Sequence, residues 1–160
     1  ALALLRERGM TPTLYLAGAG SQRLQRQAQA LAQQLGVQTQ VQFLGNVADL
    51  PERLAATQVF ALSTRWEGMP LALVEAMAAG CACIGSDVVG VREVVAPGRT
   101  GLLVPPEDAP ALADALQRLL QDTALAERLG AAARAQALEH HGRELMWQRY
   151  RALMLTEGTA

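Results

Sequence analysis

Residues 67–80 of the chain read EGMPLALVEAMAAG, and this stretch decides how the rest of the sequence is interpreted. Pro70 suits the first turn of a helix because it has no N–H to leave unpaired. The apolar run that follows has helical spacing. Glu75 stands alone in that run, and Glu67 precedes it by eight positions. We predict a helix from about residue 70 to 79, with one carboxylate before its start and one within it.

The start of this helix is a candidate anion site. The amides of Leu71, Ala72 and Leu73 are expected to face out of the first turn, where backbone N–H groups attract phosphate. Glu67 lies just ahead, in a loop that Gly68 loosens. The spacing therefore predicts two carboxylates on either side of a phosphate-binding helix start.

Glu75 needs a partner in this interpretation. It shares a helix face with Leu71 and Ala78, and the helix has no polar stripe that would keep it in water. A carboxylate taken from water without hydrogen-bond donors costs several kcal/mol, on the order of 3–5. Two explanations stay open: ligand hydroxyls, such as those of a ribose, or an arginine such as Arg92 or Arg99.

The segments around this stretch indicate an α/β domain. Short apolar segments alternate with helical ones, which is typical of a parallel sheet covered by helices on both faces. Predicted strands are 13–17, 41–44, 59–62, 81–85 and 102–104, and residues 91–95 are ambiguous. We expect one domain over 1–160, with 109–157 as its mostly helical C-terminal part.

Four predicted strand ends are rich in glycine and small polar residues: 18–20, 45–46, 63–68 and 85–90. Ligands of such sheets bind beyond the carboxyl ends of the strands, so we expect these loops at one edge. The first loop is similar to a dinucleotide motif, but Arg23 replaces its third glycine. No acidic residue follows at the expected distance of about 20 positions. A nicotinamide or flavin cofactor is therefore disfavoured.

Composition excludes several classes of protein. The net charge of −1 gives no general attraction to nucleic acid, and no apolar run has the length of a membrane span. Cys81 and Cys83 lie two apart on a predicted strand, where a disulfide between them would be strained. We expect two buried free thiols in a cytoplasmic protein. The chain opens with Ala1 and no signal peptide, as expected for a piece of a longer polypeptide.

The stretch at residues 67–80 resembles the E-x7-E signature of retaining, nucleotide-sugar-dependent glycosyltransferases of the GT-B fold, family 4 (group 1). The resemblance continues in order through LYLAGAG, VQFLGNV, ALSTRWEG, GSDVVGVREVV and GRTGLLVPPED, and so covers nearly all of the chain. It implies a three-layer, Rossmann-like parallel sheet with a C-terminal helical segment. This is the C-terminal, donor-binding half of a GT-B fold, without its first strand and without the N-terminal acceptor domain.

The resemblance also implies roles for named residues. Glu75 would accept hydrogen bonds from the nucleotide ribose, and Glu67 would hold hydroxyls of the donor sugar. Glu67 would be catalytic only in the sense that it positions that sugar. The backbone of the 68–72 turn would cradle the pyrophosphate, and the backbone near Asn46 would meet the base. These substrate-binding positions are Gly18, Asn46, Glu67, Gly68, Met69, Leu71, Ala72 and Glu75.

Several expectations follow for the reaction. A sugar would pass from a nucleotide-diphosphate sugar to an acceptor with retention of configuration, without a cofactor and, since no Asp-x-Asp pair is present, without a metal. The family's upstream Arg and Lys clamp is absent, and the chain has no lysine, so we expect this chain alone to be inactive. The full-length protein would be cytoplasmic. The sequence does not identify the acceptor, and a lipid- or membrane-linked acceptor with peripheral attachment to the membrane stays open as one option.

Two alternatives remain. The chain can be a nucleotide-binding or interaction module without turnover, with Trp147, Tyr150 and Met154 as a partner surface. An enzyme of the same fold with other chemistry, such as a sugar-nucleotide epimerase, is disfavoured by the E-x7-E motif.

Overall fold

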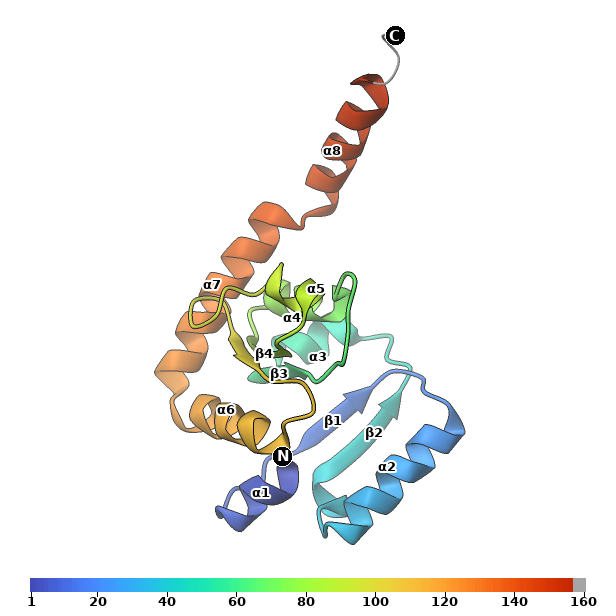
Figure 1. Cartoon of the computed structure of the whole chain (residues 1–160), viewed down its shortest axis with the longest axis vertical. Coiled ribbons are helices and arrows are strands. Elements are labelled where there is room, and N and C mark those ends of the chain that lie inside the picture. The colour runs from blue at the N-terminus through green and yellow to red at the C-terminus, as the bar shows by residue number, and fades with distance from the viewer. Residues whose placement is uncertain (157–160) are drawn as a thin grey trace.

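The structure, a computed structural model, describes residues 1–156 and alternates short strands with helices (Figure 1). The elements are α1 (Leu2–Glu7), β1 (Leu14–Ala17), α2 (Gln22–Gln34), the short 3₁₀ helix η1 (Gln38–Gln40), β2 (Val41–Gly45), α3 (Leu50–Ala55), β3 (Val59–Leu62), α4 (Leu71–Ala79), β4 (Ala82–Ser86), α5 (Val89–Arg92), β5 (Leu102–Val104), α6 (Ala109–Gln121), α7 (Thr123–His140) and α8 (Arg143–Thr156). The five predicted strands are all present, and residues 91–95, which were ambiguous, begin within α5.

The strands form two parallel sheets instead of the one sheet that the sequence suggests. β1 pairs with β2, starting from Leu14 opposite Val41. The second sheet has the order β3-β4-β5, with Val59 opposite Ala82 and Ile84 opposite Leu102. Within residues 1–156, no ladder of hydrogen bonds joins the two sheets.

The core is built around β4, which is buried along its whole length. Successive side chains of a strand point to opposite faces. Cys83 accordingly packs in a cluster with α4, α5 and α7, whereas Ala82 and Ile84 pack in a second cluster with α6 and α7. Helices therefore cover both faces of this sheet, as the apolar strands predicted (Figure 1).

The two-stranded sheet has no such cover. All four residues of β1 are exposed, and Leu14, Tyr15 and Leu16 have 38%, 54% and 38% of their surfaces accessible. Leu24 and Leu31 of the neighbouring α2 are also exposed. The expectation of a sheet buried on both faces is therefore wrong for β1, since all four of its residues stay exposed within residues 1–156.

Local signals in the sequence fix several helix ends. Ser21 accepts a hydrogen bond from the Leu24 amide at 3.2 Å, and Asp108 accepts one from the Ala111 amide at 2.8 Å. Gly80 ends α4 in the left-handed conformation, with φ 89°. These caps satisfy backbone groups that helix ends leave unpaired.

Cys81 and Cys83 are free and buried, as predicted. None of the helices within residues 1–156 combines the length and the apolar character that crossing a membrane requires. The C-terminal helix α8 extends away from the body beyond the end of α7 (Figure 1). Residue 157, the last of the predicted helical part, lies outside the described residues.

Candidate functional site

The loop after β3 and the short helix after β4 meet backbone to backbone. Gly90 of α5 is buried, and a Cβ at this position would stand 2.6 Å from the carbonyl oxygen of Gly68 and closer still to that of Glu67. Real side chains do not approach so closely, so only glycine allows this contact. The contact fixes the loop that carries Glu67 against the edge where β3 and β4 end.

The loop after β4 is itself held firmly. The Asp87 amide donates to the Val104 carbonyl at 2.7 Å, and the Arg92 guanidinium donates to the Asp87 carboxylate. This hydrogen bond holds the pKa of the Asp87 carboxyl below its usual range. Because Arg92 ends α5, the ion pair ties that helix to the end of β4 and so keeps Gly90 in place.

The loop after β3 has internal support before it reaches Glu67. The Thr64 hydroxyl donates to the Trp66 carbonyl at 2.8 Å, and Arg65 forms an exposed ion pair with Glu107 at 2.7 Å. Glu67 is half-buried, whereas Trp66 is 81% exposed. The loop therefore presents a large aromatic surface to solvent directly beside the first carboxylate.

The start of α4 offers fewer free amides than the sequence predicts. The Leu71 amide donates to the Met69 carbonyl at 2.9 Å, and the Leu73 amide donates to the Pro70 carbonyl at 3.0 Å. The prediction that these two amides face outward is wrong, because the chain turns tightly around Pro70. Within residues 1–156, the Ala72 amide has no hydrogen-bond partner and remains available to an anion.

Glu75 is exposed, so the prediction that α4 has no solvated stripe is wrong. It forms no ion pair with the arginines named as its candidate partners in the described chain. Arg92 binds Asp87, and Arg99 donates to Gln136 at 3.1 Å. The Glu75 carboxylate is therefore open to a ligand.

A pocket of about 590 Å³ lies beside Glu75, between α3, α4 and α7. Leu50 and Leu54 contribute an apolar wall, and Arg134 of α7 contributes a cation. Its volume falls in the range of sites that hold small molecules, roughly 300–1,000 Å³. Sequence reasoning missed Arg134, because a residue so far along the chain shows no local signal of this contact.

Gly18 and Asn46 follow the strands of the other sheet. The Gly18 amide donates to the Gly45 carbonyl at 2.7 Å, which joins the two loop starts directly. Gly18 has φ 120°, a conformation that favours glycine, and Asn46 is exposed. The structure thus brings the predicted site residues together as two groups, one on each sheet.

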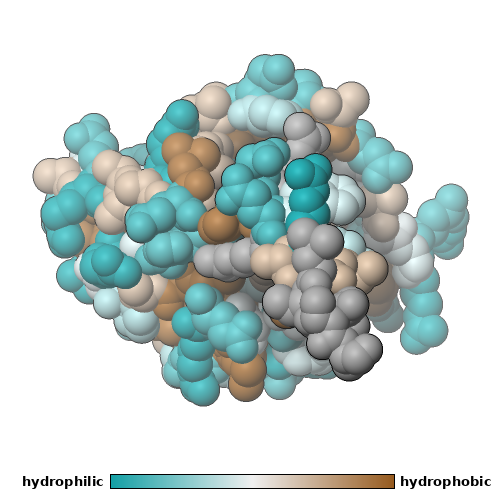
Figure 2. Space-filling view, turned by 90° about the horizontal axis from the view of Figure 1, so that it is seen from above, coloured by the Kyte–Doolittle hydropathy of each residue, from teal (hydrophilic) through white to brown (hydrophobic). Residues whose placement is uncertain are grey.

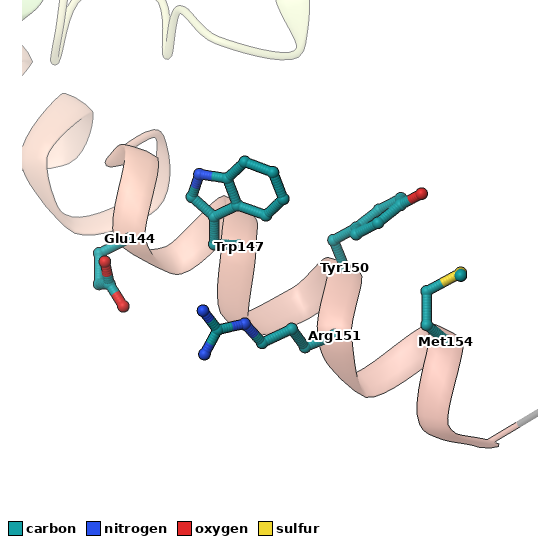
Figure 3. A pocket seen from close by; sticks show the side chains of 5 residues that line it. All are labelled: Glu144, Trp147, Tyr150, Arg151 and Met154. Atoms are coloured by element: carbon teal, nitrogen blue, oxygen red, sulfur yellow. The ribbon is translucent and has the colours of Figure 1, made fainter.

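The C-terminal helix α8 carries a second surface. Trp147 and Tyr150 meet edge to face, with ring centroids 6.1 Å apart, and line an open pocket of about 490 Å³ with Met154. Figure 3 shows these three side chains together with Glu144 and Arg151, which line the same pocket. Seen from above, Figure 2 shows apolar side chains in separate groups among hydrophilic ones.

In residues 1–156, no three His, Cys, Asp or Glu side chains gather as metal ligands would.

Comparison with known proteins gives one consistent result. The family model described as "Glycosyl transferases group 1" matches residues 1–136. The N-acetyl-alpha-D-glucosaminyl L-malate synthase of Bacillus anthracis is 34% identical over 123 residues, which are 77% of this chain and 32% of that protein.

Solved structures agree with this match. The sucrose-phosphate synthase of Thermosynechococcus elongatus superposes with a TM-score of 0.83 at 34% identity, over 96% of this chain and 42% of that one. HepE of Anabaena, in complex with UDP and glucose, superposes with a TM-score of 0.88 at 26% identity, over 96% and 44%. The chain thus spans less than half the length of each of these proteins.

Proposed function

Because this chain belongs to the glycosyl transferases group 1 family, we propose that it binds the nucleotide-diphosphate sugar for a retaining glycosyl transfer. Its architecture is half of a GT-B fold, as the resemblance led us to expect. The acceptor and the completed transfer belong to the full-length protein. HepE superposes on 96% of the present chain, and its structure is a complex with UDP and glucose.

One observation carries this proposal. The Glu67 loop is held by Gly90 at the carboxyl edge of β3 and β4, directly before a helix start with a free Ala72 amide. Ligands of parallel α/β sheets bind at this edge. Glu75 is exposed in the same helix. The Ala72 amide, a donor that can bind an anion, therefore lies between the two carboxylates along the chain.

The proposed roles follow from charge. The Ala72 amide and the positive end of the α4 dipole face the diphosphate and stabilise the negative charge that develops when it leaves. Glu75 accepts hydrogen bonds from the ribose, and Glu67 from donor-sugar hydroxyls. A carboxylate suits both jobs because its two oxygens accept from neighbouring hydroxyls. The loop at Gly18 and Asn46 meets the base.

The test uses the full-length protein and isothermal titration with UDP, GDP and ADP. We expect one nucleotide to bind most tightly, and Glu75→Gln to weaken it by about 10- to 100-fold, the loss of one charged hydrogen-bond partner. Glu127→Gln is the matched control, since Glu127 is also an exposed glutamate within a helix, α7. Equal affinity in the wild type and in Glu75→Gln would contradict the ribose role.

A second candidate is a binding module without turnover, favoured by the exposed face of α8. Trp147, Tyr150 and Met154 are 47%, 55% and 61% exposed, which is unusual for such large apolar side chains on one helix. Nucleotide binding without transfer to any acceptor by the full-length protein would support this candidate over the first.

A further inference from the structure

We propose that Arg65 is a further residue that binds the diphosphate of the donor, and that Glu107 competes with the diphosphate for this side chain. In the free protein the Arg65 guanidinium pairs with the Glu107 carboxylate. Binding of the donor exchanges this partner for the phosphate oxygens. The inference rests on the proposed function, because it adds a regulated contact to the same site.

Arg65 differs from the other cation near the Glu67 loop. In the loop after β3 and the segment from β4 to the end of α5, the guanidinium groups belong to Arg65 and Arg92. Arg92 makes two contacts with Asp87, one to its carboxylate and one to its backbone carbonyl at 3.2 Å. Arg65 makes one ion pair, with Glu107 at 2.7 Å, and its side chain is 78% exposed. Arg65 is therefore the cation of the two that can change its partner more easily.

The backbone on both sides of Arg65 is held in place. The Thr64 hydroxyl donates to the Trp66 carbonyl at 2.8 Å, and Gly90 packs against the carbonyl groups that follow. The loop then leads to the start of α4, where the Ala72 amide has no partner within residues 1–156. An arginine side chain has several rotatable bonds, so its guanidinium can change partner while the backbone stays fixed.

Glu107 occupies a backbone position that does not suit glutamate. It has φ 61° and is the one non-glycine residue with a positive φ in the part of the chain that the structure describes. Glu107 is the third residue of a turn that begins at Pro105 and is closed by the Asp108 amide, which donates to the Pro105 carbonyl at 3.4 Å. Turns of this form favour proline at the second position, here Pro106, and glycine or asparagine at the third. A strained residue of this kind is often found at a functional site.

The ion pair with Arg65 gives the glutamate at this position a reason. An exposed ion pair contributes little to the stability of a fold, and Glu107 is 65% exposed, so stability does not account for it. The pair does join the loop that carries Glu67 to the turn before α6. Its effect is to hold one positive charge beside the site until a stronger anion arrives.

A diphosphate binds Arg65 more strongly than Glu107 does. The planar guanidinium matches two phosphate oxygens, and such charge-assisted pairs of hydrogen bonds are stronger than an exposed contact with one carboxylate oxygen. The diphosphate also meets the positive end of the α4 dipole, which the Glu107 carboxylate does not use. Glu107 therefore weakens anion binding without preventing it. A nucleoside without phosphates leaves the pair with Glu107 intact.

Isothermal titration of the full-length protein with its preferred nucleoside diphosphate, chosen from UDP, GDP and ADP, tests this exchange. We expect Arg65→Gln to weaken binding by about 10-fold and Glu107→Gln to tighten it by about 3-fold. The affinity for the corresponding nucleoside should be the same in the wild type and in both variants. If the pair only holds the loop in place, both variants would weaken binding, and this result would overturn the proposal.

Asp114→Asn is the matched control for the loss of a surface carboxylate. Asp114 pairs with Arg8 at the same distance of 2.7 Å and is similarly exposed, at 67%, but it lies on α6 outside the candidate site. The Asp114→Asn variant should therefore keep the affinity of the wild type for the nucleoside diphosphate.

Glu107→Asn gives a second measurement, because asparagine tolerates a positive φ and carries no charge. This variant should bind the nucleoside diphosphate more tightly than the wild type without a lower melting temperature. Weaker binding together with a lower melting temperature would assign Glu107 to the fold and overturn the proposal. Wild-type affinity in Arg65→Gln would overturn this proposal alone, whereas a wild-type protein that binds none of the three nucleotides would overturn the proposed function as well.

Discussion

Gly90 and Gly68 touch through their backbones: a methyl group on Gly90 would lie 2.6 Å from the Gly68 carbonyl oxygen. Gly90→Ala must therefore displace the loop that carries Glu67. Overpacking of this kind costs about 1–3 kcal/mol. We expect weaker binding of the preferred nucleoside diphosphate, by roughly 10-fold, together with a lower melting temperature.

The control for this variant is Gly20→Ala, which also changes a glycine in a candidate loop. A Cβ at Gly20 would meet no atom within 4 Å, and its φ is not positive. Gly20→Ala should therefore keep the affinity of the wild type. Unchanged nucleotide affinity in Gly90→Ala would show that the contact with Gly68 does not position the site.

Trp66 should report on ligand binding. It is 81% exposed and immediately precedes Glu67, and the only other tryptophan is Trp147 on α8. In a Trp147→Phe background, adding a saturating nucleoside diphosphate sugar should change the emission of Trp66, because the ligand alters its contact with water. Emission that stays constant while calorimetry records binding would place the ligand away from this loop.

The two thiols should make stability fall in alkaline solution. Burial raises the pKa of both Cys81 and Cys83 above that of an unfolded thiol, about 8.5. A group with a raised folded pKa contributes stability below its unfolded pKa and loses it as the pH rises, since the unfolded chain releases the proton first. We expect the free energy of unfolding to fall between about pH 8.5 and 9.5.

Urea unfolding of the Cys81→Ala/Cys83→Ala double variant is the comparison, and its pH dependence in this range should be weaker. A thiol reagent supplies an independent check, because both sulfurs are buried. Neither should react quickly in the native protein, and both should react in urea. Rapid reaction of one thiol in the native state would contradict the burial.

At Gly130, a substitution by alanine would have two opposite effects on stability, one through helix propensity and one through packing. Alanine in place of glycine inside a helix normally stabilises by about 0.5–1 kcal/mol. A Cβ at Gly130 of α7, however, would stand 3.1 Å from the Gly80 carbonyl carbon and closer still to its oxygen. The overpacking cost of about 1–3 kcal/mol is larger, so we expect Gly130→Ala to lower the free energy of unfolding in urea. Stabilisation by this substitution would show that α7 can move away from α4. Ala131→Gly, on the exposed side of α7, should cost only the propensity difference.

Transfer activity should require more than this chain. We expect residues 1–160 to show no measurable glycosyl transfer under conditions in which the full-length protein turns over, because the family resemblance assigns the acceptor domain and the upstream Arg and Lys clamp to the preceding part of the polypeptide. The measurement is release of nucleoside diphosphate with a matched acceptor. Turnover by residues 1–160 close to that of the full-length protein would refute this expectation.

Much of the fold could be predicted because its signals are local. Apolar runs identified all five strands, and Ser21 and Asp108 marked helix starts through hydrogen bonds to amides three residues on. The apolar 81–85 segment also predicted correctly two buried free thiols.

The site was harder to predict because its geometry depends on contacts between distant segments. The tight turn at Pro70 uses two amides that a regular helix start would leave free. Exposure of Glu75 follows from which face of α4 meets the core, and an almost uniformly apolar helix gives no such signal. Gly90 could be noticed as part of a glycine-rich loop, but its contact with Gly68 is visible only in three dimensions.

The helix α4 is held at both ends by glycine-to-backbone contacts, from Gly90 before its start and from Gly130 at its end. A helix held in this way has little freedom to shift for a larger or smaller sugar. Engineering of donor preference should therefore leave α4 unchanged and begin with the exposed side chains that precede it, Trp66 and Met69. These two positions can change the shape and polarity of the surface beside Glu67 while both carboxylates keep their spacing.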